Sequence, residues 1–172
     1  MILESDDFER EETDEKIEAR VKAHKEYIES LAGKYNPTLY KLFLETSEFH
    51  DFYIWDVHYN ASTNKWHKEK TDKIIVELEE ALEAHNYYKI EFSNITRFLF
   101  DSHGKMMSEV CAVLIGDFSE YDRIRSQIGE IVKTEIGIDE YEKNYIRFVT
   151  SSAYVIHIGF KKFKILEKKE FA

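Results

Sequence analysis

Cysteine and proline are almost absent from this 172-residue chain, which has one of each, and glycine occurs only six times. The single Cys111 excludes an intrachain disulfide, and its apolar neighbours in VCAVLI favour a small buried residue over a nucleophile. Long uncharged apolar runs are also missing, and MILESDDFEREETDE has no cationic segment followed by an apolar one. We therefore expect a cytoplasmic protein that is neither secreted nor inserted into a membrane.

Basic residues are in short supply: 24 Lys and Arg stand against 34 Asp and Glu, which gives a formal charge of −10. Residues 1–20 hold nine acids and three bases, and so contribute −6 of that balance. A negative field repels phosphate backbones and anionic lipid. Nucleic acid and membranes are therefore not expected as partners, whereas a basic protein is a natural electrostatic match.

Hydrophobic residues make up 43% of the chain and aromatic residues 15%, which is enough apolar surface for a core. The length fits one domain, and no linker or repeat divides it. We expect a single domain over residues 1–172, in which 1–12 are frayed, 13–45 are helical and 50–170 are mainly β.

Two helices are predicted near the N-terminus. Apolar and aromatic positions recur three and four residues apart from Ile17 to Tyr35, which indicates one amphipathic face with His24 on it. This face can pack on the rest of the domain, which we favour, or pair with a second copy as a homodimer through a short coiled coil. Asn36 and Pro37 are typical of a cap and a first helical position, and predict a second helix to about Glu45.

Beyond residue 50 the hydrophobic pattern alternates, which predicts strands. The segment from Lys73 to Leu82 fits either a helix or a strand, and we favour the strand. Ser151 and Ser152 separate two alternating runs, and so predict a hairpin tip.

The predicted class is α+β, with the N-terminal helices packed on a curved antiparallel β-sheet or β-sandwich of about seven or eight strands. A short surface helix is expected at 119–127, and the expected strands are 52–59, 73–82, 87–95 extending through 97–100, 110–115, 131–138, 145–149, 154–160 and 163–166.

The stretch FHDFYIWDVHYN, residues 49–60, combines aromatic, histidine and aspartate side chains. On a regular strand, alternate residues share a face. Tyr53, Trp55, Val57 and Tyr59 would then form the core face together with Asp51. The opposite face would carry His50, Phe52, Ile54, Asp56 and His58.

A metal site is the alternative interpretation of this stretch. If the turn at residues 60–64 pairs Tyr59 with Trp66, then His58 lies opposite His67 and Asp56 lies opposite Glu69. Imidazole and carboxylate groups bind zinc and similar ions, so the alternative function is a metal-dependent hydrolase. A solvated hairpin face explains the same residues more simply, and we expect no cofactor. The candidate metal ligands are His50, Asp51, Asp56, His58 and His67.

Four segments together resemble a family: FHDFYIWDV, YYKIEFSNI, EIVKTEIGI and NYIRFVTSSAYVIHIGFKKFKIL. They are similar to small uncharacterised bacterial proteins of the Bacillus and Firmicutes type. Those proteins carry a helix, a Leu-His-Asp strand, a Phe-x-Asn/Gly-Val strand and a C-terminal β-hairpin. The resemblance covers about residues 38–166, with Phe49 where Leu is usual. Some members look like immunity proteins that protect bacteria from toxins, so the resemblance implies binding to a toxin.

We therefore expect a non-enzymatic protein-binding domain that uses an acidic surface against a basic partner such as a toxin. The candidate contacts are acidic residues spread along the chain: Glu11, Asp14, Glu18, Asp56, Glu69 and Glu77.

Overall fold

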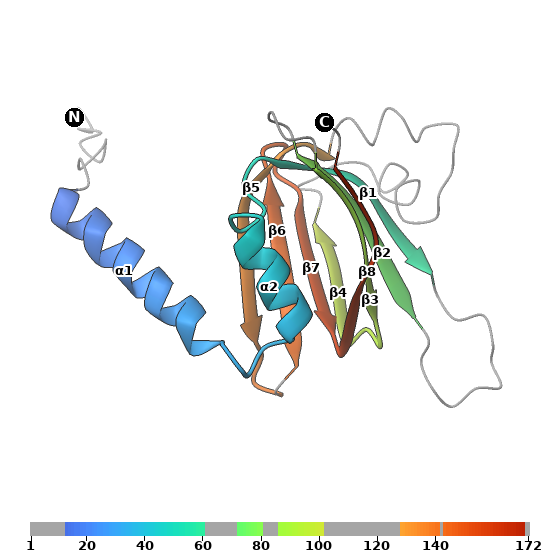
Figure 1. The fold of residues 1–172 in the computed structure, drawn as a ribbon, viewed down its shortest axis with the longest axis horizontal. Coiled ribbons are helices and arrows are strands. Elements are labelled where there is room, and N and C mark those ends of the chain that lie inside the picture. Colours follow the sequence, from blue (N-terminus) through green and yellow to red (C-terminus); the bar gives the residue numbers. More distant parts are fainter. Residues whose placement is uncertain (1–12, 61–71, 81–85, 102–127, 142, 171–172) are drawn as a thin grey trace, which may run out of the picture. The chain divides into compact units, whose positions relative to one another are not determined.

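Figure 1 shows the computed structural model, which describes residues 13–60, 72–80, 86–101, 128–141 and 143–170. The chain divides into two compact units, Met1–Lys34 and Tyr35–Ala172. The described residues contain two helices and eight strands, and the strands form two antiparallel sheets. The α+β class with antiparallel sheets is thus confirmed. No helix in the described part of the chain is long and apolar enough to cross a membrane.

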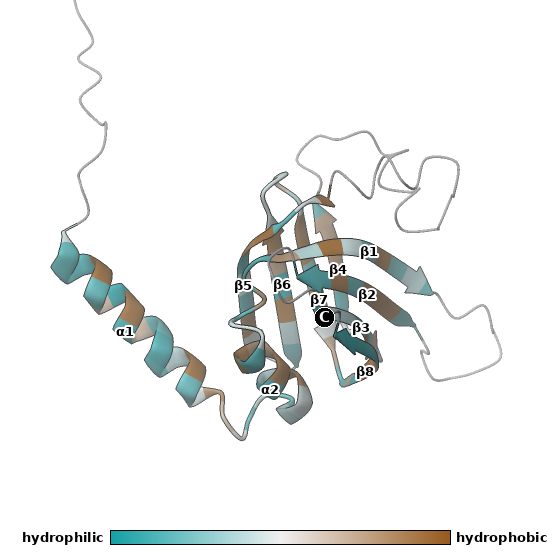
Figure 2. Cartoon of the chain, turned by 45° about the horizontal axis from the view of Figure 1, so that its top comes forward, coloured by the Kyte–Doolittle hydropathy of each residue, from teal (hydrophilic) through white to brown (hydrophobic). Residues whose placement is uncertain are grey.

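The first unit contains helix α1 (Asp14–Ser30), which confirms the predicted N-terminal helix. Two acids occupy its first turn, where negative charge opposes the helix dipole favourably. Hydrophobic patches recur along α1 in Figure 2, and Ile28 is its buried residue. Gly33 follows the helix with a φ of 76°, a left-handed conformation that glycine adopts without strain.

The second unit contains both sheets, each of four strands. The first has the order β1 (Phe52–Asn60), β2 (Lys73–Glu80), β3 (Asn86–Ser93) and β8 (Lys162–Glu170). The second has the order β4 (Arg97–Asp101), β7 (Val155–Phe160), β6 (Asn144–Thr150) and β5 (Ile131–Ile138). The segment that fitted either a helix or a strand is a strand, and its alternate apolar residues are buried on one face. The expected strand at 110–115 and helix at 119–127 lie outside the described residues.

Helix α2 (Pro37–Glu45) also belongs to the second unit and begins and ends where the sequence predicted. The Asn36 side chain accepts a hydrogen bond from the Leu39 N–H at 3.1 Å, so it caps the helix as expected. Its apolar face, which includes Leu42 and Phe43, is buried, and the helix contacts β8. Burial of this face is what stabilises so short a helix.

The two sheets share a corner. Strand β3 leads directly into β4, and β7 into β8, so the same two chain segments pair in both sheets. The last pair of one sheet is Ser93–Lys162, and the first pair of the other is Arg97–Gly159. A Cβ atom at Gly159 would lie 2.6 Å from Thr96 Oγ1, so glycine permits the close approach at this bend.

The core lies between the sheets and α2, and aromatic rings fill much of it. Phe92 and Phe160 meet across the corner with ring centroids 4.9 Å apart. Phe49 contacts Phe43, Phe52 and Phe148 edge-to-face, and its side chain is fully buried. Figure 2 shows the matching alternation of hydrophobic and hydrophilic bands along β1 and β6. Burial of this apolar area is the main stabilising term of the unit.

The core face predicted for β1 is wrong over its first half. Tyr53 and Trp55 are exposed, whereas Phe52 and Ile54 are buried. The register shifts between Ile54 and Asp56, so an extra residue is inserted there. Such a β-bulge reverses which residues face the core, and from Val57 onward the buried face is the predicted one.

Candidate binding pocket at the turn between α2 and β1

The five candidate metal ligands are not gathered into one cluster among the residues that the structure describes. His50 and Asp51 precede β1, whereas Asp56 follows its bulge and His58 lies near its far end. His58 is seven positions after Asp51, and seven steps of extended strand span roughly 23 Å. His67 lies outside the described residues. Within the described ranges, no three His, Cys, Asp or Glu side chains are placed to hold a metal ion.

The expected pairing across the turn after β1 is also wrong. Tyr59 lies opposite Ile74, His58 lies opposite Ile75 and Asp56 lies opposite Glu77. The connection between β1 and β2 is therefore much longer than the predicted tight turn. Apolar residues set this register, because Val57 and its opposite residue in β2 are both buried.

The candidate partner contacts fall in different places. Asp14 and Glu18 lie on α1, in the first unit, while Glu11 and Glu69 lie outside the described residues. Asp56 and Glu77 are cross-strand neighbours in the second unit. Glu77 is also engaged within the sheet. It accepts a 2.6 Å hydrogen bond from the Tyr87 hydroxyl and lies 3.7 Å from the Lys89 ammonium.

The structure adds a cavity that the sequence did not reveal. It has a volume of about 420 Å³ and lies where the end of α2, the following turn and the ends of β1, β2 and β3 meet. Strand pairing builds it, because Phe52 is opposite Glu80, and Tyr88 follows on the next strand. The cavity is lined by Glu45, Thr46, Ser47, His50, Asp51, Phe52, Glu80, Asn86 and Tyr88.

The turn at the mouth of this pocket has an unusual backbone. Ser47, Glu48, Phe49 and Asp51 have φ angles of 49°, 63°, 58° and 66°. Left-handed backbone costs an L-residue about 1–2 kcal/mol, so this turn is strained. Such strain persists only where the surroundings impose it, and it concentrates at functional sites.

Hydrogen bonds and the buried Phe49 ring hold the turn in this conformation. Thr46 Oγ1 donates to the Leu42 carbonyl at 2.8 Å and accepts from the Phe49 N–H at 3.2 Å. The Glu48 N–H donates to the Phe43 carbonyl at 2.7 Å. The strain is thus offset by satisfied backbone groups and by burial of one large ring.

The pocket carries a negative charge balance. Three of the lining residues, Glu45, Asp51 and Glu80, carry carboxylates, and the aromatic lining residues Phe52 and Tyr88 are buried. Neighbours orient these carboxylates. Asp51 Oδ2 lies 2.9 Å from His50 Nδ1, and Glu80 accepts a 2.8 Å hydrogen bond from Asn86. Carboxylates around aromatic faces suit an ammonium or guanidinium group.

A lysine of the same chain already lies over one of these aromatic rings. The Lys168 ammonium lies 5.7 Å from the centre of the Tyr88 ring, within range of a cation–π interaction, and 3.3 Å from Glu170. Burial raises the pKa of the Tyr88 hydroxyl, Lys168 opposes that shift and Glu45 adds to it. The phenol is therefore neutral at physiological pH, and Lys168 shows that a cation can lie over this ring.

The sequence pattern indicates His50 and Asp51, but as metal ligands. It does not indicate Glu45, Glu80, Asn86 and Tyr88, because they come from α2, β2 and β3, which only the tertiary fold brings together. No family model matches the chain, and neither curated proteins nor solved structures give a match.

Proposed function

We propose that this protein is a non-enzymatic cytoplasmic binding protein for a basic protein partner. The observation that carries the proposal is the pocket at the turn between α2 and β1, where Glu45, Asp51 and Glu80 line one cavity together with two aromatic residues. A lysine or arginine side chain of the partner enters this pocket and makes charge-assisted hydrogen bonds there.

Net charge supports the same proposal. The chain carries −10, so its field attracts a cationic protein and accelerates the encounter between the two. The resemblance to immunity proteins points to a toxin as that partner. A pocket that is already formed also suits an anchoring side chain, because little ordering entropy is lost on binding.

The test starts with recovery of the partner from the native host by affinity capture, followed by titration of that partner in buffers of increasing salt. We expect a stoichiometric cationic protein whose affinity falls steeply with salt. The double variant Asp51→Asn/Glu80→Gln should weaken binding by about tenfold or more, because charged hydrogen bonds are lost.

The matched control is Glu29→Gln/Glu140→Gln, which removes two negative charges at exposed positions that do not line the pocket. We expect this control to change affinity by less than about threefold. Equal losses in the two variants would show that only total charge matters and would contradict the pocket. Salt-insensitive binding, or the absence of a cationic partner, would contradict the proposed function itself.

A further inference from the structure

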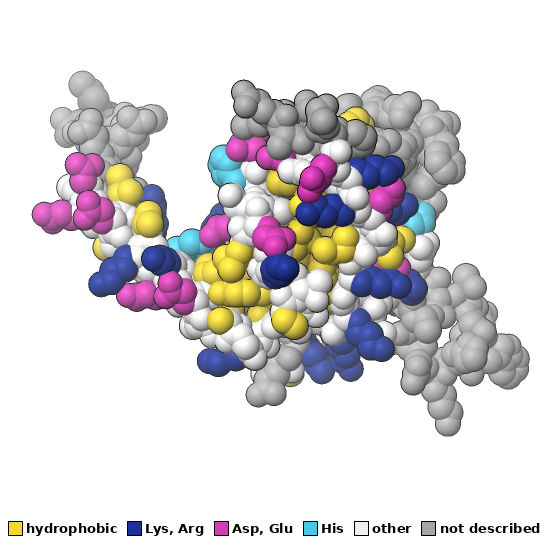
Figure 3. All heavy atoms as spheres, viewed as in Figure 1, with side chains coloured by type: hydrophobic (Ala, Val, Ile, Leu, Met, Phe, Trp, Pro, Cys, Tyr) yellow, Lys and Arg dark blue, Asp and Glu magenta, His cyan; other side chains and the backbone are white. Residues whose placement is uncertain are grey.

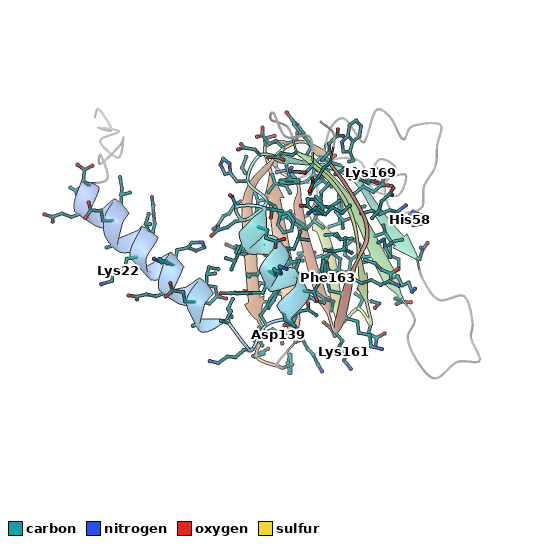
Figure 4. The ribbon with its side chains drawn as sticks, viewed as in Figure 1. Lys22, His58, Asp139, Lys161, Phe163 and Lys169 are labelled. Carbon is teal, nitrogen blue, oxygen red and sulfur yellow. The ribbon has the colours of Figure 1, made fainter. Side chains whose placement is uncertain are left out.

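A second cavity, of about 430 Å³, lies at the corner between the two sheets. Its lining includes Lys73 from β2, Glu91 from β3, and Lys161, Lys162 and Lys164 from the corner and β8. Figure 4 labels Lys161 at this corner, and Figure 3 shows Lys and Arg side chains gathered on this part of the surface. The volume is within the range of small-molecule sites.

Strand pairing brings these lysines together on one face. Lys73 pairs with Ser93, which pairs in turn with Lys162, so the three residues form a row across β2, β3 and β8. Lys164 is two residues beyond Lys162 and pairs with Glu91. Residues two apart on a strand share a face, so the Glu91–Lys164 pair lies on the same face of the sheet as the row that contains Lys162.

Glu91 organises the group. Its side chain is only 8% exposed, and its Oε1 atom lies 3.5 Å from both the Lys73 and the Lys164 nitrogens. One buried oxygen therefore holds two ammonium groups near each other. The two lysine side chains remain 43% and 61% exposed, and each ammonium group has three donors. Donors are thus left over for a ligand.

Protection of a sheet edge does not account for this cluster. Lysines on an edge strand prevent pairing with other chains, and β8 is an edge strand of its sheet. Lys73, however, lies on β2, which has neighbours on both sides. Lys73 and Lys164 both pair with the buried Glu91 carboxylate, so they do more than block an edge.

Four lysines and one glutamate give the cavity a local charge of +3, in a chain whose total is −10. The overall negative field disfavours large polyanions such as nucleic acid, and leaves small anions as ligands. Lysine is a common phosphate-binding residue, and one phosphate group carries about −1.5 to −2 at neutral pH. Two linked phosphate groups therefore match the cavity charge best.

We propose that this cavity binds a small molecule that carries two or more linked phosphate groups. The site is separate from the acidic pocket, so the two proposals can fail independently. Its specificity comes from ammonium groups of two strands and the corner between them, which must act together on neighbouring phosphate groups.

The test is calorimetric titration of the full chain with tripolyphosphate in a phosphate-free, low-salt buffer, with orthophosphate and citrate in parallel. We expect saturable binding of one tripolyphosphate per chain, weaker binding of orthophosphate and weaker binding of citrate. The variant Lys162→Gln/Lys164→Gln should lower tripolyphosphate affinity about tenfold or more, and a further Lys73→Gln should lower it again.

The control Lys22→Gln/Lys25→Gln makes the same charge change at exposed positions of α1, and should alter affinity by less than about threefold. Circular dichroism and thermal unfolding check that every variant keeps the fold. Absence of saturable binding, citrate binding as tight as tripolyphosphate binding, or an equal loss in the control would each overturn the proposal.

Discussion

Replacement of Phe49 by alanine tests how the strained turn at the acidic pocket is held. The ring is fully buried, and it contacts Phe43, Phe52 and Phe148 at centroid distances of 6.4, 5.9 and 5.7 Å. Removal of a buried Phe side chain costs about 3–5 kcal/mol through lost transfer energy and the cavity left behind. Domains are stable by about 5–15 kcal/mol, so Phe49→Ala should remove a large fraction of the total.

Phe49→Leu separates ring contacts from volume. Leucine keeps most of the apolar bulk and loses the edge-to-face contacts, which are each worth about 0.5–1.5 kcal/mol beyond area. We expect a loss of about 1–3 kcal/mol for this variant. As a positional control, Tyr53→Ala removes a ring that is 42% exposed and should cost less than about 1 kcal/mol.

The assay is urea unfolding of the full chain followed by fluorescence, with slopes compared between variants to confirm a common denatured state. A cost below about 1 kcal/mol for Phe49→Ala would refute the reasoning, because a fully buried ring cannot then be the anchor of the turn. An equal loss of unfolding free energy from Tyr53→Ala and Phe49→Ala would also refute the reasoning, since burial of the Phe49 ring would then not explain the loss.

Three further predictions concern the second sheet and the corner. Thr134 Oγ1 is buried and has no hydrogen-bond partner in the described part of the chain, so Thr134→Val should be neutral or stabilise by about 1 kcal/mol in urea unfolding. Gly159→Ala should cost about 1–3 kcal/mol in the same assay, because its Cβ would lie 2.6 Å from Thr96 Oγ1; an unchanged midpoint would contradict the tight corner. Burial, with help from Arg147, lowers the pKa of His157 below its ordinary 6.5. The unfolded chain therefore binds a proton at His157 more readily than the folded protein does. The stability associated with the neutral imidazole is fully present above pH 6.5 and is lost as the pH falls through the pKa of His157 in the folded state. His157→Gln should flatten the fall in stability between about pH 7 and 5, and an unchanged slope would contradict this assignment.

Part of the candidate site followed from sequence, and part did not. His50 and Asp51 stand out because the stretch FHDFYIWDVHYN combines histidine and aspartate side chains with aromatic ones. Their partners could not be found in that way. Glu80 reaches the pocket only because it pairs opposite Phe52, and Tyr88 only because β3 lies next to β2. Such proximity depends on register, and register depends on which apolar faces meet.

Local chemistry alone determined the helix limits and most strands of this protein. Asn36 and Pro37 fix the start of α2, because a cap and a preset φ act within a single turn. Two-residue alternation marks β3, β6 and β7, because each strand buries one face. These signals act between near neighbours, so the sequence suffices to read them.

Tertiary structure decided the bulge in β1, the pairing of β1 with β2, and both cavities. The bulge shows no mark in FYIWDV, since an extra residue is accommodated only when a partner strand and a core constrain the chain. The acidic pocket and the lysine cavity each gather side chains from segments far apart in sequence. The charged residues that line the two cavities can be read from the sequence, but they come close together only when the sheets form.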